Sequence, residues 1–217
     1  RVAGFIAAAL APIAIWLTLA LAAIAVALGH ITQHEPQNTA RKIAFTRLDW
    51  TMFVHQTHYF SYAYAIPVLV ARPELGGFGA IGFWFACGWI SYLSAETLWR
   101  RFSPRRVFII GHMSLAAILV SLTLTSAAPI WVVTFWILSG LGGGTVYCLT
   151  LLHRQSGGAP ERLERAEDAG HLVGVALALA LVLALDVTAA HLPALGAAWA
   201  LGAALLLLTI PSTVPRS

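Results

Sequence analysis

The sequence predicts an all-α membrane protein, a polytopic bundle of about seven transmembrane helices. Of its 217 residues, 59% are hydrophobic and only 10% are charged, whereas a water-soluble domain carries about 25% charged residues. The charged residues also gather in short clusters between long apolar runs, which is typical of membrane spans joined by loops. These two observations, together with a mean hydropathy of +0.79, exclude a soluble single domain.

Seven apolar runs are long enough to cross a hydrocarbon core about 30 Å thick, which takes about 20 helical residues. Tight turns are expected before Pro129 and near Pro193, because proline suits the first turn of a new helix. A β-barrel is disfavoured, because the runs lack a ten-residue alternation of apolar and polar residues. The runs cover residues 3 to 29, 50 to 70, 78 to 98, 107 to 126, 129 to 152, 170 to 190 and 194 to 211.

The positions of lysine and arginine predict the orientation of these runs. Of the 13 basic residues, only Arg1 and Arg72 lie on the side of the membrane that holds the amino terminus and the loops after the second, fourth and sixth runs. Because basic residues mark cytoplasmic loops, we expect the other loops and the carboxyl terminus to lie in the cytoplasm. This role also accounts for the pI near 9.5 without a nucleic-acid partner, and leaves membrane lipids as the surroundings. The eleven cytoplasmic residues are Arg41, Lys42, Arg47, Arg100, Arg101, Arg105, Arg106, Arg154, Arg162, Arg165 and Arg216.

The order of runs and loops predicts four segments. They are a transmembrane helix over residues 1 to 29, a cytoplasmic linker over 30 to 49, a six-helix membrane bundle over 50 to 211 and a cytoplasmic tail over 212 to 217. Residue 1 is arginine, and no cleavable signal pattern precedes the first run. We therefore expect one portion of a longer or split protein, whose amino-terminal helix bundle is missing or supplied by a partner subunit. A complete seven-helix protein is the alternative.

The loop between the third and fourth runs carries a recognisable pattern, ETLWRRFSPRR from Glu96 to Arg106. It resembles the motif G-x-x-x-D-R-x-G-R-R, which joins the second and third helices of each half in major facilitator superfamily transporters. The basic cluster and the helix that follows it match, whereas Glu96, Arg100 and Ser103 replace the two glycines and the aspartate. With the six runs from 50 to 211, the chain resembles the carboxy-terminal half of such a transporter, and residues 3 to 29 resemble the last helix of the first half.

The resemblance implies a gating or packing role for the polar residues of this loop, Glu96, Arg100, Arg101, Arg105 and Arg106. Glu96 and Arg100 are four residues apart, so they are expected to neutralise each other near the lipid headgroups. A plain cytoplasmic anchor explains the four arginines equally well. In the nearby run from 129 to 152, Gly140 and Gly144 have the four-residue spacing that lets membrane helices approach closely.

The second run carries an unusual polar stripe. At 100° per residue, Thr51, His55, His58 and Tyr62 share one helix face, with Tyr59 beside them. Ionisable side chains are costly in hydrocarbon, so this face should point toward the protein interior or an aqueous cavity. In the family that the chain resembles, the corresponding helix commonly lines the translocation path.

Three functions remain open for this stripe. The histidines and Tyr62 can bind a solute and exchange protons, since imidazole titrates near neutral pH. Alternatively, His55 and His58 ligate a transition metal or haem, although two side chains do not complete a coordination sphere. Third, the rings only satisfy each other and nearby carbonyls as structural hydrogen bonds.

The remaining ionisable residues offer fewer candidates. Asp186 is the only carboxylate well inside a run, which makes it a candidate proton site or an aspartate hydrated by the headgroups. His112 is expected near the cytoplasmic arginines, and it is the one histidine whose depth matches His55 as a haem pair. The other five histidines, His30, His34, His153, His171 and His191, are expected at helix ends or in loops.

We therefore expect a carrier of the major facilitator type, moving a small solute by alternating access, with or without proton coupling. No enzymatic activity and no cofactor are expected. Retinal is excluded because the only lysine is Lys42, in a loop, and no helix presents the residues of a hydrolase. The alternatives are a seven-helix protein that binds a metal or haem through its histidines, and a structural subunit that transports nothing.

Overall fold

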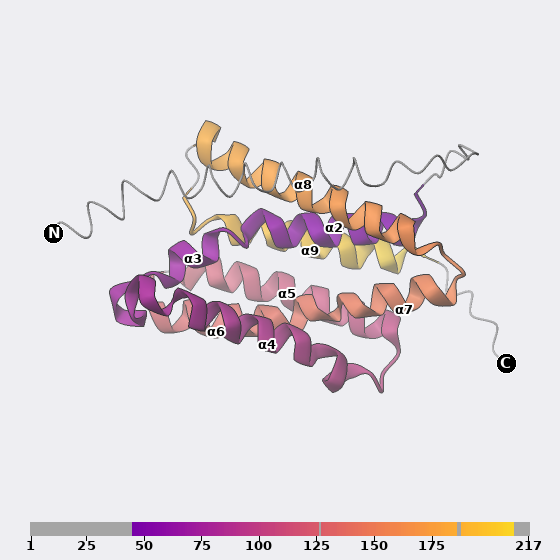
Figure 1. Cartoon of the computed structure of the whole chain (residues 1–217), viewed down its shortest axis with the longest axis horizontal. Coiled ribbons are helices and arrows are strands. Elements are labelled where there is room, and N and C mark those ends of the chain that lie inside the picture. The colour runs from indigo at the N-terminus through magenta and orange to yellow at the C-terminus, as the bar shows by residue number, and fades with distance from the viewer. Residues whose placement is uncertain (1–44, 126, 186–187, 211–217) are drawn as a thin grey trace. The chain divides into compact units, whose positions relative to one another are not determined.

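The computed structural model describes residues 45 to 125, 127 to 185 and 188 to 210. The chain divides into two units, residues 1 to 42 and 43 to 217, and the described residues all belong to the second. The predicted helix over 3 to 29, residues 30 to 44 of the predicted linker, Asp186 and the tail over 212 to 217 lie outside the described residues. Within the described part the regular structure is helical (Figure 1), as predicted.

Six helical segments follow one another along the bundle (Figure 1). Proline stands at or next to the start of α5, α6, α8 and α9, where its missing N–H costs nothing. We number the segments one to six. Their bounds are α2 (Arg47–Tyr62) with α3 (Ala65–Val70); η1 (Pro73–Leu75) and η2 (Gly77–Ala80) leading into α4 (Ile81–Trp99); α5 (Pro104–Thr125); α6 (Pro129–Gly143), η3 (Gly144–Val146) and α7 (Tyr147–Gln155); α8 (Pro160–Leu185); and α9 (Leu192–Leu208).

Four of these stretches are long and apolar enough to cross a membrane, which indicates an integral membrane protein. They are Gly77–Trp99, Pro104–Thr125, Pro129–Gln155 and Pro160–Leu183, while α9 is apolar but shorter. Large apolar side chains such as Leu124 and Phe78 are exposed on the outside, as in a helix bundle that faces lipid. The predicted run from 170 to 190 begins ten residues earlier than expected, at Pro160, because the charged stretch before it is helical.

The run predicted over 50 to 70 is broken rather than continuous. Pro67 has no N–H to donate to the carbonyl of Ala63, so that carbonyl accepts from Ile66 at 3.3 Å and the chain turns between α2 and α3. At its other end this segment begins earlier than predicted, because Thr46 and Asp49 form a capping box that starts α2 at Arg47. Residues 47 to 49 therefore belong to the bundle and not to the linker.

The helix pairs that pack together form a regular pattern. Segment one contacts segments five and six through α2, segment four contacts segments two and three through α6, and segments three and six meet through α5 and α9. Smaller contacts join α3 to α4, α7 to α8, and segment one to segment four. Suppose that segments one, two and three exchange places with segments four, five and six. Each contacting pair of segments then becomes another contacting pair, or the same pair again.

Close helix approach in segment four depends on glycine. A Cβ on Gly144 would collide with the backbone oxygen of Tyr92 and with Ala95, and a Cβ on Gly140 would collide with the backbone oxygen of Gly88. The small-residue pair predicted from the sequence therefore packs against α4. Gly143 is different, because a Cβ there would lie 3.7 Å from the ring of Tyr92, an ordinary contact.

This difference gives a matched pair of substitutions. Gly144→Ala should lower the free energy of unfolding in detergent by about 1–3 kcal/mol, since an added methyl group forces the backbones apart. Gly143→Ala should be neutral or slightly stabilising, because alanine favours helix and has room there. Equal losses for the two variants, measured by denaturant or thermal unfolding, would contradict the packing described.

Candidate functional site

The polar stripe of α2 faces the interior of the bundle, as predicted. The side chains of Thr51, His55, His58 and Tyr62 are each at most 2% exposed, and Tyr59 is partly buried beside them. This face meets α5 through the hydrogen bond between His55 and His112 and meets α9 at Tyr62, whereas α8 packs on the opposite face of α2. Burial removes water as a hydrogen-bond partner, so each ring nitrogen needs a partner from the protein or remains unsatisfied.

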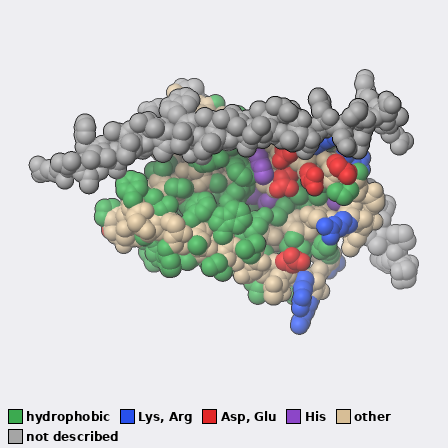
Figure 2. All heavy atoms as spheres, in the orientation of Figure 1, with side chains coloured by type: hydrophobic (Ala, Val, Ile, Leu, Met, Phe, Trp, Pro, Cys, Tyr) green, Lys and Arg blue, Asp and Glu red, His purple; other side chains and the backbone are tan. Residues whose placement is uncertain are grey.

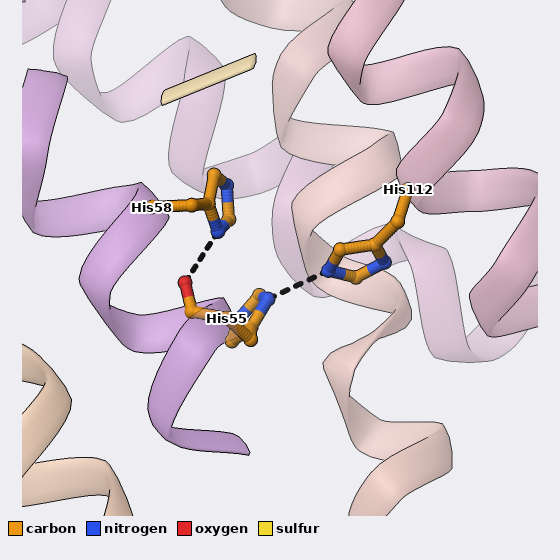
Figure 3. A group of neighbouring side chains, drawn as sticks. All are labelled: His55, His58 and His112. Atoms are coloured by element: carbon orange, nitrogen blue, oxygen red, sulfur yellow. Dashed lines mark hydrogen bonds between the residues drawn. The ribbon is translucent and has the colours of Figure 1, made fainter. Parts of the chain in front are cut away.

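A third histidine completes the cluster. His112 of α5 is fully buried, and its Nε2 lies 2.7 Å from Nδ1 of His55 (Figure 3). Its ring centroid is 5.8 Å from that of His58 and 3.8 Å from that of Phe108, on which it stacks. The predicted depth match of His112 with His55 is confirmed by this hydrogen bond. Sequence spacing cannot bring residues 55 and 112 together, because their contact depends on how α2 packs on α5.

The hydrogen bonds fix where the ring protons lie. His58 Nδ1 donates to the backbone oxygen of His55, and His112 Nδ1 donates to the backbone oxygen of Phe108 at 3.1 Å (Figure 3). A carbonyl oxygen can only accept, so in the neutral rings both protons are on Nδ1 and both Nε2 atoms carry lone pairs. His55 Nδ1 therefore donates to His112 Nε2, while Nε2 of His58 is buried with no partner in the part of the chain that the structure describes.

The same distances bear on the haem alternative. Two axial imidazoles on opposite faces of a haem need their nitrogens about 4 Å apart, twice a metal–nitrogen bond of about 2 Å. The 2.7 Å between His55 and His112 is a direct hydrogen bond and leaves no room for a porphyrin. A single ion is a different matter, since one nitrogen from each of the three rings lies within 4.8 Å of the others.

A second polar group lies between α2 and α8, and sequence reasoning missed it. Gln56 donates to Glu167 and its amide oxygen lies 3.0 Å from Nε2 of His171. His171 and Glu167 are also 3.9 Å apart, with side chains 33% and 41% exposed. Both were expected near the solvated end of a loop, but the closely packed Gly170 and its neighbours hold them against α2. The signal available in the sequence was the i,i+4 spacing of Glu167 and His171.

Figure 2 shows patches of acidic, basic and histidine side chains gathered on one half of the described surface, while the other half is mostly apolar. A cavity of about 10 Å³, enough for one water molecule, lies between α2, α4 and α6. None of the three clustered histidines lines it, so the wet crevice expected beside their rings is not present in the described part. The cavity is lined by Tyr59, Tyr62, Gly88, Trp89, Tyr92, Trp136, Ser139, Gly140 and Gly143.

The residues predicted to act at the basic loop do not form a common cluster in the described part. Among the described residues no ion pair joins Glu96 to Arg100, so the expected neutralisation was wrong, and both side chains are exposed. Arg105 is half-buried and donates to the backbone oxygen of Leu208 at 3.1 Å, where a cation stabilises the end of α9. Arg101 and Arg106 are exposed.

The start of α2 is fastened to the end of α7 by a buried pair. His153 Nε2 lies 3.1 Å from a carboxylate oxygen of Asp49, and both side chains are at most 3% exposed. His153 was expected at a hydrated helix end, which is wrong because α7 carries it into the bundle against Asp49. The other oxygen of this carboxylate accepts from the backbone N–H of Thr46 at 2.7 Å. The pair holds segments one and four together at this end.

Comparisons with known proteins bring no relative. No protein family matches the chain, and neither does any curated protein or solved structure. The interpretation of the site therefore depends on its geometry.

The hydrogen bond between His55 and His112 predicts a non-additive pair of substitutions. His112→Leu leaves the N–H of His55 buried without an acceptor, which should cost about 1–3 kcal/mol in the free energy of unfolding. The double variant His55→Leu with His112→Leu removes both partners and should lose less than the single variant. Unfolding curves in one detergent test this, and additive losses would contradict the bond.

Proposed function

We propose that the chain is the carboxy-terminal helix bundle of a major-facilitator-type carrier, which moves a small solute by alternating access. The second bundle is supplied by an amino-terminal portion or by a partner subunit. In this proposal seven helices span the membrane, with residues 3 to 29 as the first, and no enzymatic step is involved. The observation that carries the proposal is the exchange symmetry of the helix contacts.

Two repeats of three helices, inserted with opposite orientation, would produce this symmetry. Because each repeat has an odd number of helices, the second one starts from the opposite side of the membrane. Every main contact then maps onto its counterpart, as the helix pairs described above do. Such inverted three-helix repeats are the building plan of each half of a major facilitator transporter.

The breaks in segments one and four support the same proposal. Segment one breaks after the 16 residues of α2, and segment four breaks after the 15 residues of α6. These segments correspond to each other under the exchange. In transporters, interrupted helices at corresponding positions of two repeats are the best indication of the binding region.

The partly exposed polar group also favours a second bundle. Gln56 meets Glu167 and His171 where the charged start of α8 passes into its apolar remainder, and a polar side chain exposed to lipid there is costly. A cavity shared with another bundle would hydrate them. Protons can pass between His55 and His112, whose nitrogens share one hydrogen bond, and Asp186 remains a candidate proton site.

Accessibility of a thiol in the cavity wall tests alternating access. In a background of Cys87→Ser and Cys148→Ser, Ser139→Cys should react with a charged, membrane-impermeant thiol reagent from either side of the membrane, in proportions that change with the solute gradient. Met113→Cys is the control, since its side chain is 52% exposed near the middle of the apolar helix α5, where a membrane-impermeant reagent should not reach it. Labelling from neither side, or from one side under every condition, would favour a structural subunit.

The proposed orientation has its own test. Ser103→Cys in the basic loop should be labelled only from the cytoplasmic side, and Glu74→Cys in η1 only from the opposite side. Both positions are exposed, one in the connection before α4 and the other in the connection after it, so the two thiols should have similar intrinsic reactivity. Labelling of Ser103→Cys from outside intact cells would invert the assignment made from the basic residues.

A second candidate function is metal binding without transport, and the arrival of His112 beside the two predicted histidines favours it. The sequence offered two ligands on one helix, which do not complete a coordination sphere. The structure adds a third imidazole from another helix. That site does not depend on a rocking mechanism and is argued next.

A further inference from the structure

We propose that His55, His58 and His112 bind one late first-row transition-metal ion, of which zinc is the representative, and leave a fourth position open. This inference goes beyond the proposed carrier, because all three ligands belong to this bundle and the site needs no second bundle. One nitrogen from each ring lies within 4.8 Å of the others. Tetrahedral zinc with bonds of about 2.0–2.1 Å places its ligands about 3.3 Å apart, so the rings must rotate to bind it. The ring of His58 must rotate most, because its Nδ1 rather than its Nε2 is turned toward His55 (Figure 3).

The hydrogen bonds already leave two of the three rings with a nitrogen lone pair, and not an N–H, available to a metal ion. His58 and His112 each donate Nδ1–H to a backbone oxygen, which leaves Nε2 of both rings free to ligate. Outer-shell carbonyls fix metal-binding imidazoles in this way in known sites. Thr145 also supports His112, since its hydroxyl donates to Gly142 and lies 3.3 Å from Nδ1 of the ring.

His55 would complete the set by releasing its bond to His112. Its Nδ1–H now donates to His112 Nε2 at 2.7 Å. In the metal-bound form the proton of His55 resides on Nε2, and Nδ1 becomes the third ligand. The ring stays neutral, so this step is a tautomer change and consumes no proton.

The unpartnered nitrogen of His58 is what a purely structural role leaves unexplained. Hydrogen bonds engage Nδ1 of His55 and both ring nitrogens of His112, but Nε2 of His58 is fully buried and has no partner among the described residues. Natural proteins rarely leave a buried polar atom unsatisfied, so each such atom requires an explanation. A metal ion bound to this lone pair supplies one.

The ligand chemistry selects the class of ion and the route to it. Three neutral imidazoles suit zinc, copper, nickel or iron, whereas magnesium and calcium require oxygen ligands. The cavity between α2, α4 and α6 reaches Tyr62, whose ring centroid is 5.9 Å from that of His58. An ion or a fourth ligand would therefore enter past Tyr62.

Metal analysis of the purified full chain tests the proposal. The protein carries an affinity tag without histidine, is stripped with a chelator, and is reloaded with zinc in detergent. We expect one zinc per chain by mass spectrometry, and the visible absorption of tetrahedral cobalt when cobalt replaces zinc. X-ray absorption should count three imidazole ligands and one non-imidazole ligand, such as a water oxygen.

Glutamine substitutions identify the ligands, because glutamine has a similar size and can still form hydrogen bonds. His58→Gln and His112→Gln should each weaken zinc affinity at least 100-fold, whereas His191→Gln, on an exposed residue, should leave it unchanged. Zinc should also raise the melting temperature of the unsubstituted chain and not that of His58→Gln. This comparison remains informative if a variant is itself less stable.

Three outcomes would overturn the metal site. They are no stoichiometric zinc or cobalt in the unsubstituted chain, full retention of zinc in His58→Gln, and loss of zinc in His191→Gln to the same extent. Each is distinguishable from failure of the carrier proposal, because labelling of Ser139→Cys is measured in chelator-stripped protein as well as in zinc-loaded protein. A chain that binds zinc tightly and shows no alternating labelling would be a static metalloprotein.

Discussion

Burial of three imidazole rings inside an apolar bundle is the constraint on which the rest of the structure depends. Each ring must find an acceptor for its proton away from water, and the acceptors lie on α2, on α5 and in the break of segment four. Gly111 makes this possible, because a Cβ there would collide with the side chain of Thr145. The histidines therefore fix the distance between α5 and η3 as much as apolar packing does.

Glycine also allows close approach at two other interfaces, between segments four and two and between segments five and one. These two interfaces exchange with each other when the helix triplets exchange. Gly140 and Gly144 bring segment four against segment two, and Gly170 with Gly174 bring segment five against segment one. In both, glycines four residues apart allow contact with the partner's backbone. Surfaces without protruding side chains can slide, and small residues serve this purpose in membrane helices, where no hydrophobic force holds one helix to another.

Periodicity and composition predicted the helical class, four of the apolar stretches, the inward face of α2 and the close approach of Gly140 and Gly144. They could not predict that His112 meets His55, or that His153 meets Asp49, because both contacts join residues far apart in the chain. Hydropathy also misplaced the start of α8, since the charged residues from Glu161 to Asp168 lower the apolar score of a helix in which Glu167 contacts Gln56. The local sequence around a polar residue near the end of an apolar run does not show whether its side chain is exposed to water or packed against another helix.

The closed packing of the histidines links the two proposals made for them. Tyr59 and Tyr62 lie between the cavity and the ring of His58, so an ion, a proton or a solute reaches the cluster only when these aromatic side chains move. They belong to segment one, and the cavity's other walls belong to segments two and four, whose mutual contact is made by glycine. Separation of these helices would open the cluster, and their closure returns it to the state described. An ion or proton bound to the histidines would then favour the open or the closed state, by the difference between its affinities for the two states.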